Sequence, residues 1–191
     1  MKGRGRRPPL WRPIFSDQRD SAIQMSNLVV MGVSGCGKSS LGEALAQALG
    51  WPLVEGDDHH PATNQAKMRA GQPLTDADRA GWLATLGQQL AARPQGAVLT
   101  CSALKRAYRD QLRAASPGLG FVHLRLSLDE ARRRVAARPD HLFPASLVDS
   151  QFATLEDPSG EPGVLTLEAT LPLTTLCAQA LAWMKESHDV C

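Results

Sequence analysis

Residues 28–41 read Leu-Val-Val-Met-Gly-Val-Ser-Gly-Cys-Gly-Lys-Ser-Ser-Leu, and no other stretch says as much about the architecture. The apolar run Leu28–Met31 predicts a short buried strand, and apolar residues at helical spacing predict a helix over Lys38–Leu49. Between them, Gly32–Ser39 matches the pattern G-x-x-x-x-G-K-[ST] in full. Glycines let the backbone curl so that N–H groups face phosphate oxygens, and a helix N-terminus favours an anion. The stretch therefore predicts a phosphate-binding loop for a nucleotide.

The loop also carries the side chains that nucleotide chemistry needs. Lys38 can reach the β- and γ-phosphates, and the Ser39 hydroxyl can ligate Mg²⁺. The alternative is a simple glycine turn between strand and helix. Cys36 is interpreted as a small residue that fits the loop, or alternatively as a reactive thiol, since a helix N-terminus lowers a thiol pKa. The residues expected to bind ATP in this loop are Gly32, Val33, Ser34, Gly35, Cys36, Gly37, Lys38, Ser39 and Ser40.

Outward from the loop, strand and helix patterns alternate along the chain. Short apolar runs predict four more strands, at 52–55, 97–101, 121–126 and 164–167, with helical patterns between them. Alternating strands and helices imply right-handed crossovers and a parallel sheet with helices on both faces, an α/β/α three-layer sandwich. Gly50 predicts the C-terminal end of one helix, whereas Thr75 with Asp78 and Ser127 with Glu130 predict the N-terminal ends of two others. Helices are expected over 104–115, from 127 to about 138, over 145–155 and over 173–185.

Composition limits the function classes. The chain has 191 residues, of which 43% are hydrophobic and 21% charged, with a net charge of +2, as expected of one globular domain. Residues 1–24 carry a charge of +4 and the remainder −2, so the folded part lacks the basic excess that non-specific nucleic-acid binding needs. No apolar run is long enough for a membrane helix. The four cysteines form no C-x-x-C pair, which disfavours zinc and thioredoxin-like sites and indicates reduced thiols in the cytoplasm.

The N-terminal stretch is expected to lie outside the domain. Residues 1–24 have no apolar segment of a secretory signal, and Pro8, Pro9 and Pro13 prevent a continuous amphipathic helix. We expect a disordered basic tail over 1–24, with Met25 as a candidate start. The nucleotide-binding domain is then expected over 25–187, with a short tail over 188–191.

Among nucleotide-binding proteins, the missing motifs narrow the choice. A GTPase needs a guanine-reading Asn/Thr-Lys-x-Asp sequence, which the chain lacks. A motor ATPase would normally end the third strand with an acid, whereas this one ends before Ser102. A short chain without that acid favours a small-molecule kinase.

Longer motifs resemble the gluconokinase family. The sequence Gly-Asp-Asp-His-His-Pro at 56–61, the pattern from Asn64 to Leu83, Cys-Ser-Ala-Leu-Lys at 101–105 and Ser-Gln-Phe at 150–152 carry the likeness, which spans roughly residues 27–185. The resemblance implies a fold similar to shikimate and adenylate-type kinases, with strand order 2-3-1-4-5 and a mobile helical lid at about 134–148. It also implies ATP, Mg²⁺, D-gluconate as acceptor and a homodimer. Departures are Cys36, Gly81 and Leu142, where the family commonly has serine, proline and a Gly-His-Phe lid motif.

Acidic and histidine candidates follow the second strand. Asp57 lies at the carboxyl edge of the sheet, where ligands of open α/β sheets bind, and could orient the acceptor hydroxyl, take its proton and hold Mg²⁺ through water. Its alternative is a solvated acid or a helix cap near Pro61, for which Asp58 is the better candidate. His60 matches the family's histidine and is assigned to the substrate, with a structural hydrogen bond as the equal alternative.

Basic candidates follow the third strand and flank the lid. Lys105 and Arg109 are spaced i, i+4 and could bind the acid substrate or the transferred phosphoryl group, or form a solvated helix face. Arg79 is assigned to the substrate by resemblance to shikimate kinases, with a surface ion pair as alternative. Arg134 and Arg138 could close over ATP with the lid, or merely flank a surface loop.

Two rival functions stay open. The first is a kinase of the same fold for another small metabolite, such as shikimate. The second is a non-catalytic regulator that binds ATP and changes shape.

Overall fold

The computed structural model describes residues 25–137 and 145–189. The expected tail 1–24 and the centre of the expected lid, with Arg138, lie outside the described residues. The described elements are β1 Leu28–Met31, α1 Lys38–Leu49, β2 Leu53–Glu55, the 3-10 turn η1 Gly56–His59, α2 Ala62–Arg69, α3 Asp76–Ala91, β3 Val98–Cys101, α4 Arg106–Ala115, β4 Gly120–Arg125, α5 Leu128–Ala136, η2 Ala145–Leu147, α6 Val148–Thr154, β5 Val164–Glu168 and α7 Leu173–Asp189.

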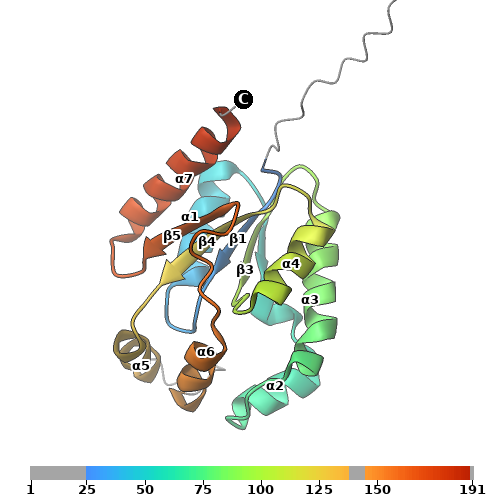
Figure 1. Ribbon diagram of the computed structural model, residues 1–191, viewed down its shortest axis with the longest axis vertical. Helices are drawn as coiled ribbons and strands as arrows, with labels where there is room; N and C mark the ends of the chain where they lie inside the picture. The colour runs from blue at the N-terminus through green and yellow to red at the C-terminus, as the bar shows by residue number, and fades with distance from the viewer. Residues whose placement is uncertain (1–24, 138–144, 190–191) are drawn as a thin grey trace, which may run out of the picture.

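The five strands form one parallel sheet in the order β2-β3-β1-β4-β5 (Figure 1). β1 lies in the centre, with Leu28 opposite Val98 of β3 on one side and Gly120 of β4 on the other. The expected strand order and parallel pairing are confirmed. Since all carboxyl ends of parallel strands meet at one edge, the loops that follow β1, β2 and β3 converge there.

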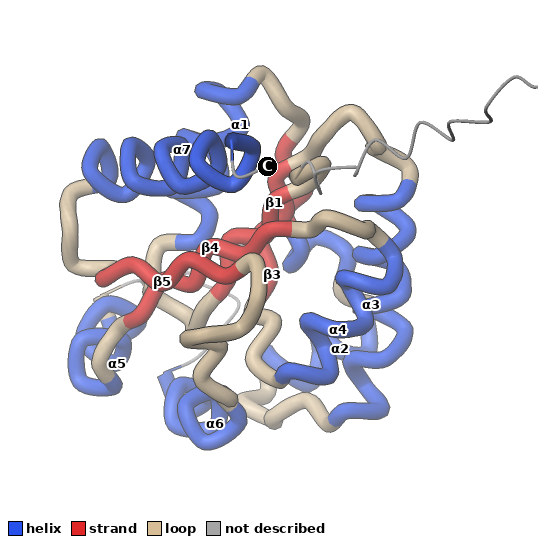
Figure 2. Tube along the Cα trace, turned by 45° about the horizontal axis from the view of Figure 1, so that its top comes forward, coloured by secondary structure: helices blue, strands red, loops and turns tan. Residues whose placement is uncertain are grey.

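Two apolar cores cover the two faces of the sheet, because side chains alternate along a strand. Leu28 and Val30 belong to the core beneath α1 and α7, whereas Val29 and Met31 belong to the core beneath α3 and α4. Figure 2 shows these helix pairs on opposite sides of the sheet. The predicted three-layer sandwich is therefore confirmed.

Helix ends agree with the sequence in part. The Thr75 side chain and the Asp78 side chain form the expected reciprocal capping box at α3, and Gly50 ends α1 in a left-handed conformation at φ 66°. Ser127 accepts from the Glu130 N–H, but the Glu130 carboxylate pairs with arginines of its own helix rather than returning to the cap. α4 begins at Arg106, two residues later than predicted, and α7 continues through Asp189, beyond the expected end.

The two ends of the described domain lie together, away from the carboxyl edge. Met25 and Ser187 line the same hollow, and in Figure 1 the end of α7 lies at the top while α2, α5 and α6 lie at the bottom. Among the described helices, none is both long and apolar enough to cross a membrane.

Candidate active site

The loop between β1 and α1 forms a small hollow at the carboxyl edge of the sheet. Gly32 has φ 140°, and a Cβ there would lie 2.8 Å from the Leu124 carbonyl oxygen, so the turn requires glycine. Gly37, at φ 97°, precedes the first residue of α1. The hollow is lined by Ser34, Gly35, Gly37, Lys38, Ser39, Ser40 and Asp57. This loop has the glycine turns, the helix N-terminus and the lysine that a phosphate site needs.

A second, deeper pocket adjoins this hollow and shares three of its residues, Ser34, Lys38 and Asp57. Two groups placed in the two cavities would therefore meet beside Lys38 and Asp57. Such a meeting point is what transfer between two bound molecules requires. The other residues that line the second pocket are His60, Met68, Pro73, Leu74, Arg79, Trp82, Ser102, Leu147, Ser150 and Gln151.

Two contacts tie the shared residues to their surroundings. The Lys38 ammonium group donates to the Val33 carbonyl oxygen at 3.1 Å, so it lies across the loop. The Ser34 N–H donates to Oε1 of Gln151 at 2.6 Å, although the two residues are 117 positions apart in sequence. α6 therefore contacts the phosphate loop directly.

Asp57 lies in η1, immediately after β2, and its position is set by the residue before it. A Cβ at Gly56 would lie 2.2 Å from the Thr100 carbonyl oxygen, so β2 and β3 approach too closely for any side chain there. The Gly56 carbonyl oxygen accepts from the Trp82 indole N–H at 2.8 Å. The Asp57 side chain is 55% exposed and faces both cavities.

The helix-cap alternative for the two acids after β2 is wrong. Pro61 precedes the first residue of α2, and no side chain caps that helix. Asp57 and Asp58 both lie in η1, which ends before Pro61. Asp57 is thus free for the pocket, while the prediction of a cap at Asp58 fails.

His60 is buried in the pocket wall. Its ring stacks on Trp82 with centroids 4.1 Å apart, and its Nε2 lies 3.9 Å from the Asp57 carboxylate. Nδ1 is buried and has no hydrogen-bond partner among the described residues, which argues against the structural hydrogen bond. Burial lowers the pKa of His60, an effect that the Asp57 carboxylate opposes and the Arg79 guanidinium assists.

Arg79 brings positive charge to the pocket from the first turn of α3. Its guanidinium donates to the Leu74 carbonyl oxygen at 2.5 Å and lies 5.8 Å from the ring centre of Tyr108. Within the described residues it has no carboxylate partner, which argues against the alternative of an ion pair. Arg79 and Lys38 are the two cations that line this pocket in the described part of the chain.

Lys105 and Arg109 do not line the pocket, and the structure places them differently. Lys105 precedes α4 in an extended conformation, so the two residues do not share a helix face, and its ammonium group pairs with Asp76 at 2.8 Å. The Arg109 side chain is completely buried and pairs with Glu161 at 2.5 Å. Arg109 is therefore not available to a small molecule in the pocket, and its predicted contact with the acceptor is wrong. The Lys105 side chain is 30% exposed, and its contact with the acceptor stays a prediction.

Two further predictions concern the surroundings of the loop. Arg134 lies against the loop, where its guanidinium donates to the Gly35 carbonyl oxygen at 3.5 Å and to that of Ala169 at 3.2 Å, and its contact with ATP stays a prediction.

Cys36 is 1% exposed, and burial raises the pKa of its thiol. The alternative of a reactive thiol is therefore wrong, and Cys36 fills space beneath the loop.

Sequence reasoning missed much of the pocket wall. Ser102, Ser150 and Gln151 line it with hydroxyl and amide groups, and Met68, Leu74 and Trp82 add apolar surface. Ser102, Ser150 and Gln151 lie within motifs that resemble the gluconokinase family, and that likeness was the available signal. Their spacing alone gave none, since the contacts join distant parts of the chain.

The residues present fit a magnesium ion bound together with phosphates. The Ser39 hydroxyl and the Asp57 carboxylate line the same hollow as Lys38, and oxygen ligands are those that Mg²⁺ prefers. Among the described residues, no group of three or more histidine, cysteine or acidic side chains is arranged so that it could hold a metal ion. An ion held by one or two side chains and by phosphate oxygens suits this arrangement.

Comparisons with known proteins agree with this geometry. A family model described as an AAA domain matches residues 28–158. A gluconokinase of Gluconobacter oxydans is 53% identical over 142 residues, which cover 72% of this chain and 79% of that protein. The thermoresistant gluconokinase of Escherichia coli is 37% identical over 162 residues, covering 83% and 93%.

A solved structure is similar in fold over most of the chain. The crystal structure of a gluconokinase from Sinorhizobium meliloti superimposes with a TM-score of 0.80 at 47% identity, covering 87% of this chain and 95% of that one.

Proposed function

Because the chain belongs to the gluconokinase family, we propose that it transfers the γ-phosphoryl group of ATP to the 6-hydroxyl group of D-gluconate. The observation that carries the proposal is the pair of adjoining cavities, which share Ser34, Lys38 and Asp57. One cavity has the features of a phosphate site, and the other offers polar groups and cations to a sugar acid. The shared residues lie where the two substrates would react.

The roles follow from the chemistry of each side chain. Lys38 stabilises the negative charge on the transferred phosphoryl group, because its ammonium group has three N–H donors and the Val33 carbonyl oxygen accepts from one of them. Asp57 orients the acceptor hydroxyl and takes its proton as the bond to phosphorus forms. Ser39 and Asp57 would hold Mg²⁺, directly and through water. When bound, Mg²⁺ neutralises charge on the phosphate oxygens.

The acceptor pocket suits a polyhydroxy acid. Ser102, Ser150 and Gln151 offer hydrogen-bond partners to hydroxyl groups. Arg79 supplies a cation for the carboxylate, in place of the buried Arg109. The polar wall and the acid at the transfer point also argue against a regulator that only binds ATP.

The test is ADP release coupled to an optical readout, with ATP and a panel of acceptors including D-gluconate, shikimate and glucose. We expect turnover with gluconate and its loss in Lys38→Ala, with an unchanged circular dichroism spectrum. Preference for shikimate would favour the rival kinase. ATP binding without acceptor-dependent ADP release would favour the regulator.

Three accompanying predictions remain part of this proposal. Mg²⁺ dependence is expected from the donor set, and titration of an EDTA-treated sample would measure it. A homodimer and a cytoplasmic location are expected from the family resemblance and from the cysteine pattern. Light scattering after gel filtration and fractionation of the source cells would test them.

A further inference from the structure

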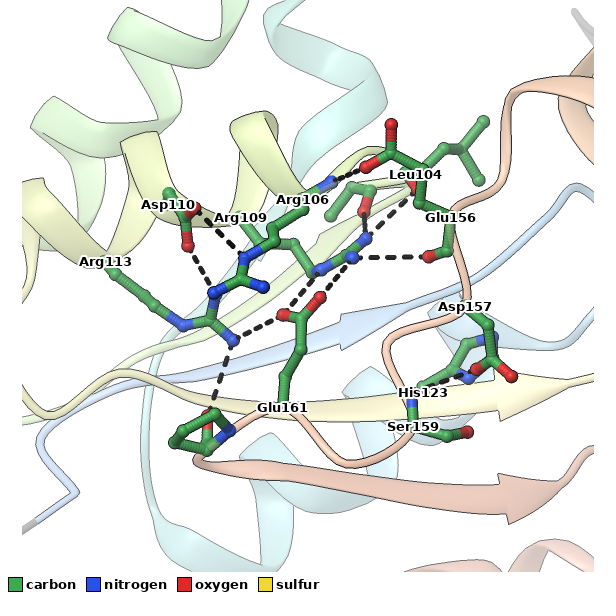
Figure 3. A network of polar contacts seen from close by, with 12 residues as sticks. Leu104, Arg106, Arg109, Asp110, Arg113, His123, Glu156, Asp157, Ser159 and Glu161 are labelled. Carbon is green, nitrogen blue, oxygen red and sulfur yellow. Dashed lines mark hydrogen bonds and ion pairs between the residues drawn. The ribbon is translucent and has the colours of Figure 1, made fainter.

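Arg109 forms the centre of a buried polar network between two loops, drawn in Figure 3. Its side chain is 0% exposed, and all five guanidinium N–H groups have acceptors. Nε and one terminal nitrogen donate to the Glu161 carboxylate at 3.1 and 2.5 Å. The remaining N–H groups donate to main-chain carbonyl oxygens at 2.9–3.2 Å, those of Ala103, Leu104 and Glu156.

These acceptors belong to two connections that are distant in sequence. Ala103 and Leu104 lie between β3 and α4, whereas Glu156 and Glu161 lie between α6 and β5. The connections also contact each other, because the Glu156 N–H donates to the Leu104 carbonyl oxygen at 2.9 Å. The Glu156 carboxylate accepts from the Arg106 N–H at 2.7 Å. Arg109 therefore joins the two connections through one planar group.

The first connection holds a strained residue next to the pocket. Ala103 has φ 42°, and among the described residues it alone, apart from glycines, has a positive φ. That conformation is unfavourable for alanine and persists where surrounding contacts hold it. Arg109 binds its carbonyl oxygen, and the residue before it, Ser102, lines the pocket.

The second connection holds the C-terminal end of α6. This helix carries Ser150 and Gln151 into the pocket wall, and Gln151 accepts from the N–H of Ser34 in the phosphate loop. Leu155 ends the helix, and Glu156 follows it directly. A shift of Glu156 would therefore move the helix that contacts the phosphate loop.

We propose that Arg109 is a positioning residue that acts from behind the pocket, by fixing Ser102 and α6 relative to each other. This inference rests on the proposed function, because it takes the pocket as the acceptor site. Misplacement of about 1 Å around reacting groups can lower a rate about 100-fold. Arg109 thus supports catalysis without touching either substrate.

The test compares Arg109→Lys with a matched control on the same helix. Lysine keeps the positive charge beside Glu161, but it cannot donate five hydrogen bonds in one plane. Arg113 also pairs with Glu161, at 2.9 Å, and contacts Pro162, yet it reaches no atom of the first connection. Arg113→Met therefore removes the ion pairs to Glu161 and Asp110 and the contact with the Phe121 ring, and it leaves the hydrogen bonds from Arg109 to both connections intact.

Two measurements read out positioning separately from folding. We expect Arg109→Lys to lower kcat/KM for gluconate about tenfold or more while the KM for ATP changes less than about threefold. Arg113→Met should stay within about twofold of the original protein in both values. Hydrogen exchange, followed by mass spectrometry, should become faster in Arg109→Lys at the amides of Arg106 and Glu156, and not in Arg113→Met.

Each result of these measurements either supports or overturns the positioning role of Arg109. Wild-type exchange rates at Arg106 and Glu156 in Arg109→Lys would overturn the proposal, as would a loss of activity that only follows the folded fraction. If Arg109→Lys does not fold, Glu161→Gln keeps an oxygen acceptor and should give the same changes in weaker form. Absence of gluconate turnover in the original protein would count against the proposed function alone, since the exchange measurement needs no acceptor.

Discussion

Asp57 combines exposure with a fixed backbone. Its side chain is 55% exposed, yet the Gly56 backbone before it is held against Thr100 and Trp82. Among the residues that line both cavities in the described part of the chain, it carries the one carboxylate. A rigid backbone with a reachable carboxylate suits a group that meets a substrate hydroxyl.

We predict that Asp57→Asn separates turnover from nucleotide binding. The amide has nearly the same shape, so packing is kept, but it cannot take a proton. We expect kcat to fall about 100-fold or more, in the range of lost general-base catalysis, while the Kd for ATP changes little. Steady-state kinetics and calorimetric titration with ATP measure the two values. If ATP affinity fell as far as kcat, Asp57 would belong to the nucleotide site instead.

We predict that Gly56→Ala destabilises the protein. The added Cβ would lie 2.2 Å from the Thr100 carbonyl oxygen, so β2 and β3 would have to separate. We expect a loss of about 1–3 kcal/mol in the free energy of unfolding, as for other overpacked sites. Urea denaturation measures the change.

The control for this prediction is Gly81→Ala. A Cβ at Gly81 meets nothing within 4 Å, and the residue lies inside α3. We expect a gain of about 0.5–1 kcal/mol there, because alanine favours the helix. Equal effects of the two substitutions would contradict the close contact at Gly56.

At the scale of elements, β4 carries a buried histidine beneath the α6–β5 connection. His123 is 2% exposed, and burial lowers its pKa to about 4 from an ordinary 6.5. Asp157 and Glu168 oppose this shift, whereas Arg109 and Arg125 assist it. In Figure 3 His123 lies next to Asp157.

We predict that His123 makes the fold weaker in acid. The His123 ring binds a proton more readily in the unfolded chain than in the folded protein. The neutral buried ring therefore contributes fully to stability above about pH 6.5, and this contribution is lost as the pH falls toward 4. One pKa unit corresponds to about 1.4 kcal/mol, so lowering the pKa from 6.5 to about 4 gives a loss of roughly 3 kcal/mol in the free energy of unfolding. Urea denaturation at pH 7.5 and pH 4.5 should show a smaller difference between the two pH values in His123→Gln.

The sequence predicted the elements better than their ends. Apolar runs identified all five described strands, because buried parallel strands are apolar on both faces. The start of α4 was misplaced since Leu104 and Lys105 fit a helical pattern, whereas the Leu104 carbonyl oxygen is bound by Arg109 and by the Glu156 N–H. Contacts from elsewhere in the fold thus decided a boundary that local spacing could not.

Whether a site residue could be predicted also depended on how far apart in the sequence its contacts lie. The phosphate loop lies within one continuous segment, so its pattern sufficed. The i, i+4 spacing of Lys105 and Arg109 gave no sign of a glutamate 52 residues beyond Arg109. Gln151 was missed as a pocket residue because its contact with Ser34 spans 117 residues.

At the scale of the whole molecule, the charge of the pocket predicts discrimination between acceptors. Lys38 and Arg79 oppose the single acid Asp57 in its lining. Gluconate carries a carboxylate and glucose carries none. A lost charge-assisted contact and the unpaired cation left behind together correspond to roughly 2.7 kcal/mol or more, so kcat/KM for glucose should be at least about 100-fold lower.

Arg79→Met should reduce the ratio of the two kcat/KM values, because it should lower kcat/KM for gluconate and leave kcat/KM for glucose unchanged. The measurement is kcat/KM for both acceptors in both proteins. Equal use of glucose and gluconate by the unaltered protein would contradict the acid-binding pocket. An unchanged ratio in Arg79→Met would place the carboxylate elsewhere.

Met25 and Ser187 line one hollow at the end of the molecule remote from the phosphate loop. A short linker from Asp189 to Met25 should therefore permit a circular permutant, with new termini in the exposed turn at 94–95 between α3 and β3. We expect the permutant to keep gluconate turnover within about tenfold of the original protein, since neither the new termini nor the linker touches the pocket. Loss of folding would contradict the closeness of the two ends. The same geometry means that a surface tether at either end would leave the pocket facing the solution.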